Sequence, residues 1–169
     1  MRTSLLALLH QLEAEASTGR VAVRGVQTGW VYVNEGRIYC VERNGEPSLF
    51  EAMEAAGLFE PADLDLALRV PVLDRWRLLL RGDEHRITET RAFARRHATE
   101  HLRPLLAPVY DSTFVPKIEH PLGPLGSWTV DELLGEPTGG DGDVVDVAGG
   151  DQVIDARDAA PLHNGGASH

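Results

Sequence analysis

The sequence predicts an α+β fold with an N-terminal helix, a three-stranded antiparallel meander, a mostly helical C-terminal half and a disordered tail. Three observations lead to this prediction. Leucines recur at helical spacing near the start of the chain, three β-branched and aromatic runs follow, and two capping boxes begin later helices. With 169 residues, of which 43% are hydrophobic, the chain can build a core without disulfides or metals. We therefore expect one domain over residues 1–136 and a Gly/Asp-rich acidic tail over 137–169.

Residues 4–16 are expected to form an amphipathic helix. Thr3 and Ser4 can cap its first turn, and a Ser-Thr-Gly run at 17–19 ends it. The apolar positions at helical spacing are Leu5, Leu8, Leu9 and Leu12.

Three strands are expected next, over residues 20–24, 29–33 and 37–42, because each run is rich in β-branched or aromatic side chains. The Asn-Glu-Gly run at 34–36 supplies a tight turn, with glycine where the backbone needs a positive φ. The three strands should therefore form a meander that ends in a tight hairpin.

The two faces of this hairpin differ in chemistry. Side chains alternate along a strand, which places Val31 and Val33 on one face and the aromatic rings on the other. Trp30 and Tyr32 lie on that second face. We expect the valine face to be covered and the aromatic face to be partly exposed, which makes it a candidate docking surface.

Three helices are expected after the hairpin. Ser48 and Glu51 form a capping box that begins the first, which ends at Gly57. Pro61 begins a short second helix, and Pro71 separates it from a third that ends near residue 82.

A longer helix is expected from about Asp83 to His101, with a thin apolar stripe. The stripe consists of Ile87, Ala94, Ala98 and Leu102, with Phe93 at its edge. Five prolines make residues 103–127 mostly extended or looped, with one short strand around 113–115. A Thr-x-x-Glu capping box at 129–132 begins the last helix.

Composition and charge exclude several classes of protein. The formal net charge is −10, which opposes nonspecific binding of nucleic acid. The tail holds six aspartates and one arginine, which leaves −5 on the tail and −5 on residues 1–136. The single cysteine, Cys40, excludes an internal disulfide and a cysteine-based zinc cage. No apolar stretch reaches the ~18–20 residues of a membrane span and no signal peptide is evident, so we expect a cytoplasmic protein.

The sharpest enzymatic pattern is the His-Ala-Thr-Glu-His run at 97–101, which matches the H-x-x-E-H signature of inverted zinc proteases. In that signature two histidines one helical turn apart bind zinc, and the glutamate activates water. Two preceding arginines place positive charge beside the histidines, and no downstream motif marks a third ligand. We therefore favour a solvated helix face and expect no metal or other cofactor. A zinc-dependent hydrolase built on His97, Glu100 and His101 is the remote alternative.

Arginines gather along residues 86–103 and could contact phosphates, which makes a DNA-binding transcriptional regulator the second hypothesis. They are Arg86, Arg91, Arg95, Arg96 and Arg103. Glu84, Glu89 and Glu100 interleave with them, as on a solvated, ion-paired helix, so nucleic acid is the disfavoured partner.

Several stretches carry a family resemblance. They are LLALLHQL at 5–12, STGRVAV at 17–23, GWVYVNEGRIY at 29–39 and SLFEAM at 48–53, and WTVDELL at 128–134 is similar to a closing helix. In order and spacing they resemble the bacterial PATAN domain, over residues 4–57 and, with the closing helix, to about residue 136. The resemblance implies a non-catalytic module of bacterial signalling, often joined to receiver domains, that mediates protein–protein contacts. It supplies no catalytic residues.

We therefore expect a non-catalytic bacterial signalling adaptor that binds a protein partner, not an enzyme. Its candidate anchors are Trp30, Tyr32 and Tyr39, because aromatic side chains dominate binding hot spots. The alternative for each of them is packing under the flanking helices, because aromatic side chains also dominate cores. A membrane is not an expected partner, and monomer and homodimer both stay open.

Overall fold

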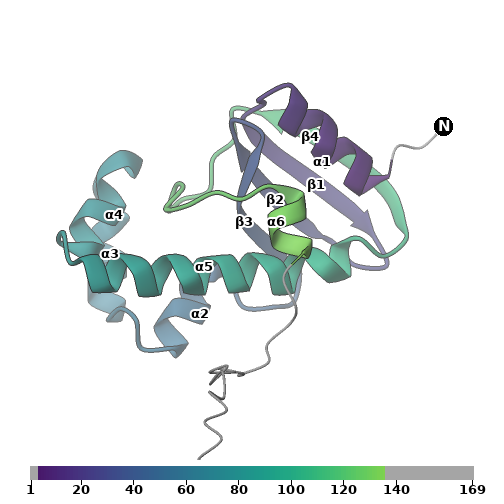
Figure 1. Ribbon diagram of the computed structural model, residues 1–169. Coiled ribbons are helices and arrows are strands. Elements are labelled where there is room, and N and C mark those ends of the chain that lie inside the picture. Colours follow the sequence, from purple (N-terminus) through teal and green to yellow (C-terminus); the bar gives the residue numbers. More distant parts are fainter. Residues whose placement is uncertain (1–3, 136–169) are drawn as a thin grey trace, which may run out of the picture. The chain divides into compact units, whose positions relative to one another are not determined.

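The computed structural model describes residues 4–135, and Figure 1 shows their arrangement. Within these residues the elements in chain order are α1 (Leu5–Ala14), β1 (Gly19–Gly25), β2 (Gly29–Asn34), β3 (Arg37–Arg43), α2 (Leu49–Ala55), α3 (Pro61–Ala67), α4 (Val72–Leu80), α5 (Glu84–Leu105), β4 (Val109–Pro116) and α6 (Val130–Leu134). The α+β class, the N-terminal helix, the antiparallel meander and the later helices are confirmed. The predicted tail at 137–169 lies outside the described residues.

The sheet of the described chain has four strands in the order β3-β2-β1-β4, and every neighbouring pair is antiparallel. β1, β2 and β3 form the predicted meander, whereas β4 returns from far along the chain and pairs with β1 over its whole length. The expectation of mostly looped structure with only a short strand at 113–115 is wrong here. Pro108 and Pro116 lie at the two ends of β4, which is an edge strand and tolerates prolines there.

One face of the sheet is covered by helices. Val21, Val31 and Val41 lie in register across β1, β2 and β3, and all three are fully buried. Figure 1 shows α1, α5 and α6 in front of the sheet. The leucines of α1 and the apolar stripe of α5 belong to the same hydrophobic core as these valines.

The opposite face, called the Trp30 face below, is defined by Arg20, Ala22, Trp30 and Thr113. Ala22 pairs with Trp30 on β2 and with Thr113 on β4, so these three residues form a row across the sheet. All four side chains are at least partly exposed. The expected partly exposed aromatic face is thus present at Trp30, whereas Tyr32 beside it is buried.

The turn between β2 and β3 docks onto the end of α1. Gly36 has a φ of +78°, and a Cβ added to it would lie 2.6 Å from the Cα of Glu13. Its amide donates to the Ser17 carbonyl at 2.7 Å, and the Glu35 amide donates to the Thr18 hydroxyl at 2.8 Å. Both the backbone conformation and the close approach therefore require glycine at this position.

Both predicted capping boxes are present. Ser48 and Glu51 exchange side-chain and backbone hydrogen bonds at the start of α2, as do Thr129 and Glu132 at the start of α6. These two helices are short, so their caps satisfy a large share of their free backbone amides.

Helix α5 extends to Leu105 rather than ending near His101, and Pro104 lies in its last turn. A proline there removes one backbone hydrogen bond, and burial of Leu102 and Leu105 offsets that loss. The predicted core residues that are buried on α5 are Ala94, Ala98 and Leu102. Among residues 4–135 no helix, α5 included, is both long and apolar enough to cross a membrane.

Candidate functional site

The three aromatic residues expected to anchor a partner lie in different surroundings. Trp30 is partly exposed on the Trp30 face, and the guanidinium carbon of Arg20 lies 6.0 Å from its ring centroid. Tyr32 and Tyr39 are only 6% and 4% exposed, because both contact His120 in the loop before α6. Of the three, Trp30 is therefore the one that a partner can reach on the folded chain.

A buried hydrogen-bonded network surrounds His120. Its backbone amide donates to the Tyr39 hydroxyl at 2.8 Å, and its ring Nε2 donates to the Glu42 carboxylate at 3.0 Å. The Leu122 amide donates to the other ring nitrogen, Nδ1, at 3.2 Å. The ring also packs edge-on against Tyr32, with 5.1 Å between centroids. These contacts fasten the loop before α6 to β3.

Burial sets the protonation states in this network. Desolvation raises the pKa of Tyr39 to about 12, so its hydroxyl keeps its proton and accepts the His120 amide. Burial alone would raise the pKa of Glu42, but the hydrogen bond from His120 and the attraction to that ring more than offset it, and the pKa is lowered. Burial raises the pKa of the Cys40 thiol well above its ordinary value, so this cysteine is a neutral thiol rather than a nucleophile.

Cys40, Glu42 and His120 each place one potential ligand atom within 4.8 Å of the others. Their hydrogen bonds nevertheless oppose a metal. A metal on Nε2 would need the ring proton on Nδ1, but Nδ1 accepts the amide of Leu122, so the proton lies on Nε2. A metal also needs a thiolate, whereas Cys40 holds its proton. These residues fit a structural network and do not fit a metal centre.

Replacing Tyr39 with phenylalanine is expected to lower the free energy of unfolding by about 1–3 kcal/mol, because the buried His120 amide loses its acceptor. The ring itself still fills the same space. Urea unfolding followed by circular dichroism measures the effect. An unchanged free energy would mean that water replaces the hydroxyl, and it would contradict the stabilising role of the network.

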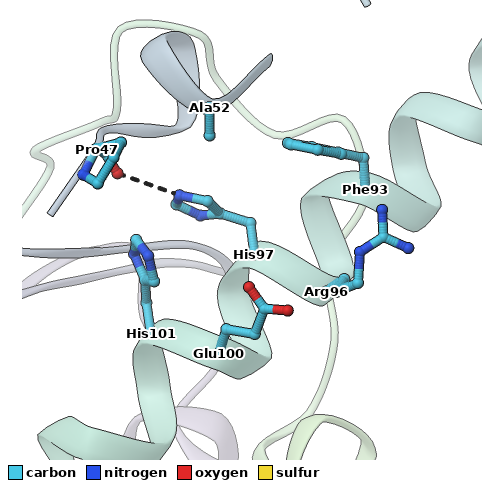
Figure 2. A pocket seen from close by; sticks show the side chains of 7 residues that line it. All are labelled: Pro47, Ala52, Phe93, Arg96, His97, Glu100 and His101. Atoms are coloured by element: carbon cyan, nitrogen blue, oxygen red, sulfur yellow. Dashed lines mark hydrogen bonds between the residues drawn. The ribbon is translucent and has the colours of Figure 1, made fainter. Parts of the chain in front are cut away.

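A second polar cluster lies between α5 and the segment that precedes α2. His97 and His101 project from adjacent turns of α5, with ring centroids 3.9 Å apart (Figure 2). They are only 6% and 7% exposed. Both line a cavity of about 210 Å³. Its other lining residues are Pro47, Ala52, Phe93, Arg96 and Glu100.

The expectation of a solvated helix face at 97–101 is wrong for both histidines. α5 packs along β3, and the two rings lie against backbone carbonyls of β3 and of the segment that precedes α2. Nε2 of His97 lies 3.5 Å from the Pro47 oxygen, and Nδ1 of His101 lies 3.2 Å from the Val41 oxygen. Glu100, which lies between them in the sequence, remains exposed. The two histidines therefore belong to the core and the glutamate to the surface.

The two histidines are held neutral. Burial lowers the pKa of His97 to about 4, and the neighbouring ring of His101 acts in the same direction. Burial also lowers the pKa of His101, with a further contribution from the positive charge of Arg43. At pH 7 each imidazole therefore keeps one ring nitrogen without a proton.

Four of the five arginines of α5 make contacts within the chain. Three of them donate to backbone carbonyls: Arg86 to Leu58, Arg95 to Glu132 and Arg103 to Leu134. A fourth, Arg96, lies 5.5 Å from the ring centroid of Phe93. A phosphate bound along this helix would have to compete with these contacts.

Sequence reasoning missed the His120 network and the burial of the histidine pair. His120 lies 78 residues from Glu42, so no local pattern connects them. A signal for the pair was present, because His97 and His101 follow Ala94 and Ala98 by three residues each and so adjoin the apolar stripe.

The chain matches no family model, and no curated protein and no solved structure is significantly similar to it. The PATAN resemblance therefore stays a prediction that the sequence motifs alone support.

Proposed function

We propose that this chain is a non-catalytic bacterial signalling adaptor that works in the cytoplasm and binds a protein partner through the Trp30 face. The observation that carries the proposal is Trp30 itself, an aromatic side chain that packs against the core and remains partly exposed on the Trp30 face. The other tryptophans, Trp76 and Trp128, are each 8% exposed and belong to the core. Trp30 therefore stands apart from the tryptophans that serve packing alone.

The chemistry of the Trp30 face suits recognition by a pocket. A tryptophan ring buries a large apolar area on binding and can anchor a whole interface. Arg20 beside the ring offers a cation to a carboxylate of the partner. Arg24 and Asp111 face each other across β1 and β4 and are exposed, so they supply charges at the rim that orient a partner.

The family resemblance points the same way. The stretch at 29–39 that resembles the PATAN hairpin also carries Trp30. A module of that kind would act by contact with another protein, and an anchor on a segment that carries the resemblance agrees with such a role.

Affinity capture from the native bacterium tests the proposal with three tagged proteins: the wild type, Trp30→Ala and Leu73→Ala. Leu73 is 92% exposed on α4 and serves as the matched control for loss of an exposed apolar side chain. We expect the wild type and Leu73→Ala to recover the same stoichiometric protein after nuclease treatment. The amount of this partner captured by the Trp30→Ala variant should fall roughly tenfold or more, because the variant lacks the aromatic anchor.

Four outcomes would overturn the proposal. Equal capture by Trp30→Ala would place the interface elsewhere, and selective loss in Leu73→Ala would place it on α4. Unfolding of Trp30→Ala in circular dichroism would make Trp30 a core residue. A discrete DNA fragment recovered in place of a protein would favour the regulator hypothesis.

A further inference from the structure

The two edges of the sheet differ in how far the described chain covers them. At the β3 edge, Ile38 exchanges two backbone hydrogen bonds with Trp128, both 2.8 Å long. Further along the same edge, the His101 ring donates to the Val41 carbonyl at 3.2 Å. At the other edge, β4 pairs with β1 and with no other described strand. Within residues 4–135 the outer side of β4 is therefore the open edge of the sheet.

The register determines which backbone groups of β4 point away from β1. In an antiparallel ladder, every second residue bonds to the neighbouring strand and the residues between them point outward. The Lys117 amide donates to the Thr18 carbonyl at 3.1 Å, which sets this alternation. The residues of β4 that bond to β1 are therefore Asp111, Thr113 and Val115. The amides and carbonyls of Ser112 and Phe114 face outward, and no described element bonds to them.

The middle of β4 lacks the features that usually protect an edge strand. Such strands commonly carry a lysine, a central proline or a bulge that stops further pairing. The bulge of β4 lies at its beginning, opposite Arg24 and Gly25, and Pro116 is its last residue. The uncharged run at 112–114 lies between them, so it can accept a further strand.

We propose that this edge binds a second copy of the chain, with β4 antiparallel to β4 of the other copy, so that the two sheets become continuous. A two-fold axis at Thr113 places Ser112 of each copy opposite Phe114 of the other. These outward-facing residues then exchange backbone hydrogen bonds on both sides of the axis. A register shifted one way would set Ser112 against Pro116, which has no amide to donate, and the opposite shift would set Phe114 against the bulge at residue 110.

The side chains that this register brings together are complementary. Thr113 is exposed and lies opposite Thr113 of the other copy, which is a favourable pair in antiparallel sheets. Asp111 lies opposite Val115 of the other copy, and Arg20 is next to Val115 in the same row. Each Asp111 thus approaches a cation, and the two Asp111 residues stay apart. On the other face of the sheet, the two Phe114 rings lie diagonally within reach of each other.

This match of β4 to itself favours a second copy over an unrelated extended segment as the occupant of the edge. The two-fold axis runs perpendicular to the sheet, so both Trp30 faces of the dimer lie on the same side. The pairing does not depend on the proposed adaptor role, because none of its backbone contacts involves Trp30.

Sedimentation equilibrium of the full chain from about 5 µM to about 500 µM tests the pairing. We expect the wild type to pass from monomer to dimer over this range, because a short edge makes a small interface. Thr113→Lys sets two like charges against each other at the axis and should raise the dissociation constant at least tenfold. Thr88→Lys makes the same change at an exposed position of α5 and should dimerise as the wild type does.

Disulfide trapping tests the register. In Thr113→Cys the two new thiols face each other at the axis, so oxidised glutathione should link them into a covalent dimer. In Asp111→Cys the two thiols lie roughly 13 Å apart along the strands, which is too far for a disulfide. The native Cys40 is buried and should not be linked.

Three results would overturn the pairing. A wild type that stays monomeric at the highest concentration would leave the edge to an extended segment of another protein. Equal dimerisation of the wild type and a folded Thr113→Lys would place the interface elsewhere, such as on the Trp30 face. Equal trapping of Thr113→Cys and Asp111→Cys would mean random collision instead of a defined register. If circular dichroism shows that Thr113→Lys is unfolded, the comparison of the two cysteine variants decides.

Discussion

Replacing Gly36 with alanine is expected to lower the free energy of unfolding by about 4 kcal/mol. The new Cβ would meet three backbone atoms of α1: Glu13 Cα at 2.6 Å, Glu13 O at 2.8 Å and Leu12 O at 2.8 Å. Backbone atoms cannot step aside as a flexible side chain can, so either α1 or the β2–β3 turn must move. Urea unfolding at pH 7, followed by circular dichroism, measures the loss.

Gly45 provides the matched control. Its φ of +82° is close to the +78° of Gly36, but a Cβ added to it meets nothing within 4 Å. Gly45→Ala should therefore show only the cost of the left-handed backbone, about 1 kcal/mol. Equal losses in the two variants would mean that α1 adapts freely, and would contradict a rigid contact between the turn and the helix.

Acid is expected to destabilise the protein through His97, by about 3 kcal/mol between pH 6.5 and pH 4. The pKa of His97 is about 4 in the folded state, against an ordinary value of 6.5. In this pH window the unfolded chain therefore binds a proton that the folded chain does not, so stability falls as the pH falls. The groups that act on the ring are His101 on its own helix, the Pro47 carbonyl, Glu42 on β3 and His120 in the loop before α6.

The measurement is the free energy of unfolding in urea at several pH values from 7 to 4. His97→Gln cannot take up this proton and should show a flatter dependence on pH, whatever its stability at pH 7. His85→Gln, on the exposed first turn of α5, should keep the wild-type slope. A wild-type slope in His97→Gln would assign the acid sensitivity to other groups, such as the carboxylate of Glu42, whose pKa is lowered.

Elements with local signals could be predicted from the sequence. The leucine spacing of α1 depends only on residues within the helix, and the capping box of Ser48 and Glu51 spans a single turn. The tight turn at Gly36 follows from a local need for positive φ. The meander could be predicted because its three strands follow one another in the chain and each pairs with the next.

Elements that depend on distant partners could not be predicted in full. β4 is longer than the short strand expected at 113–115, because pairing with β1 extends it up to its flanking prolines. Tyr39 was a candidate anchor for a partner, and its burial follows from contacts such as the hydrogen bond from His120, 81 residues away. His97 and His101 are polar by type, and their burial follows from the way that α5 packs along β3.

The late return of β4 has a consequence for synthesis and folding. β1 lies between β2 and β4, so its outer backbone groups find partners only after residue 116 has been made. Until then a nascent chain presents β1 as an unpaired edge, which can pair with the same edge of another chain. A chain truncated before Val109 is therefore not a smaller domain but a template for intermolecular β-sheet growth. Pairing over such a long sequence separation also makes the docking of β4 a slow step in folding.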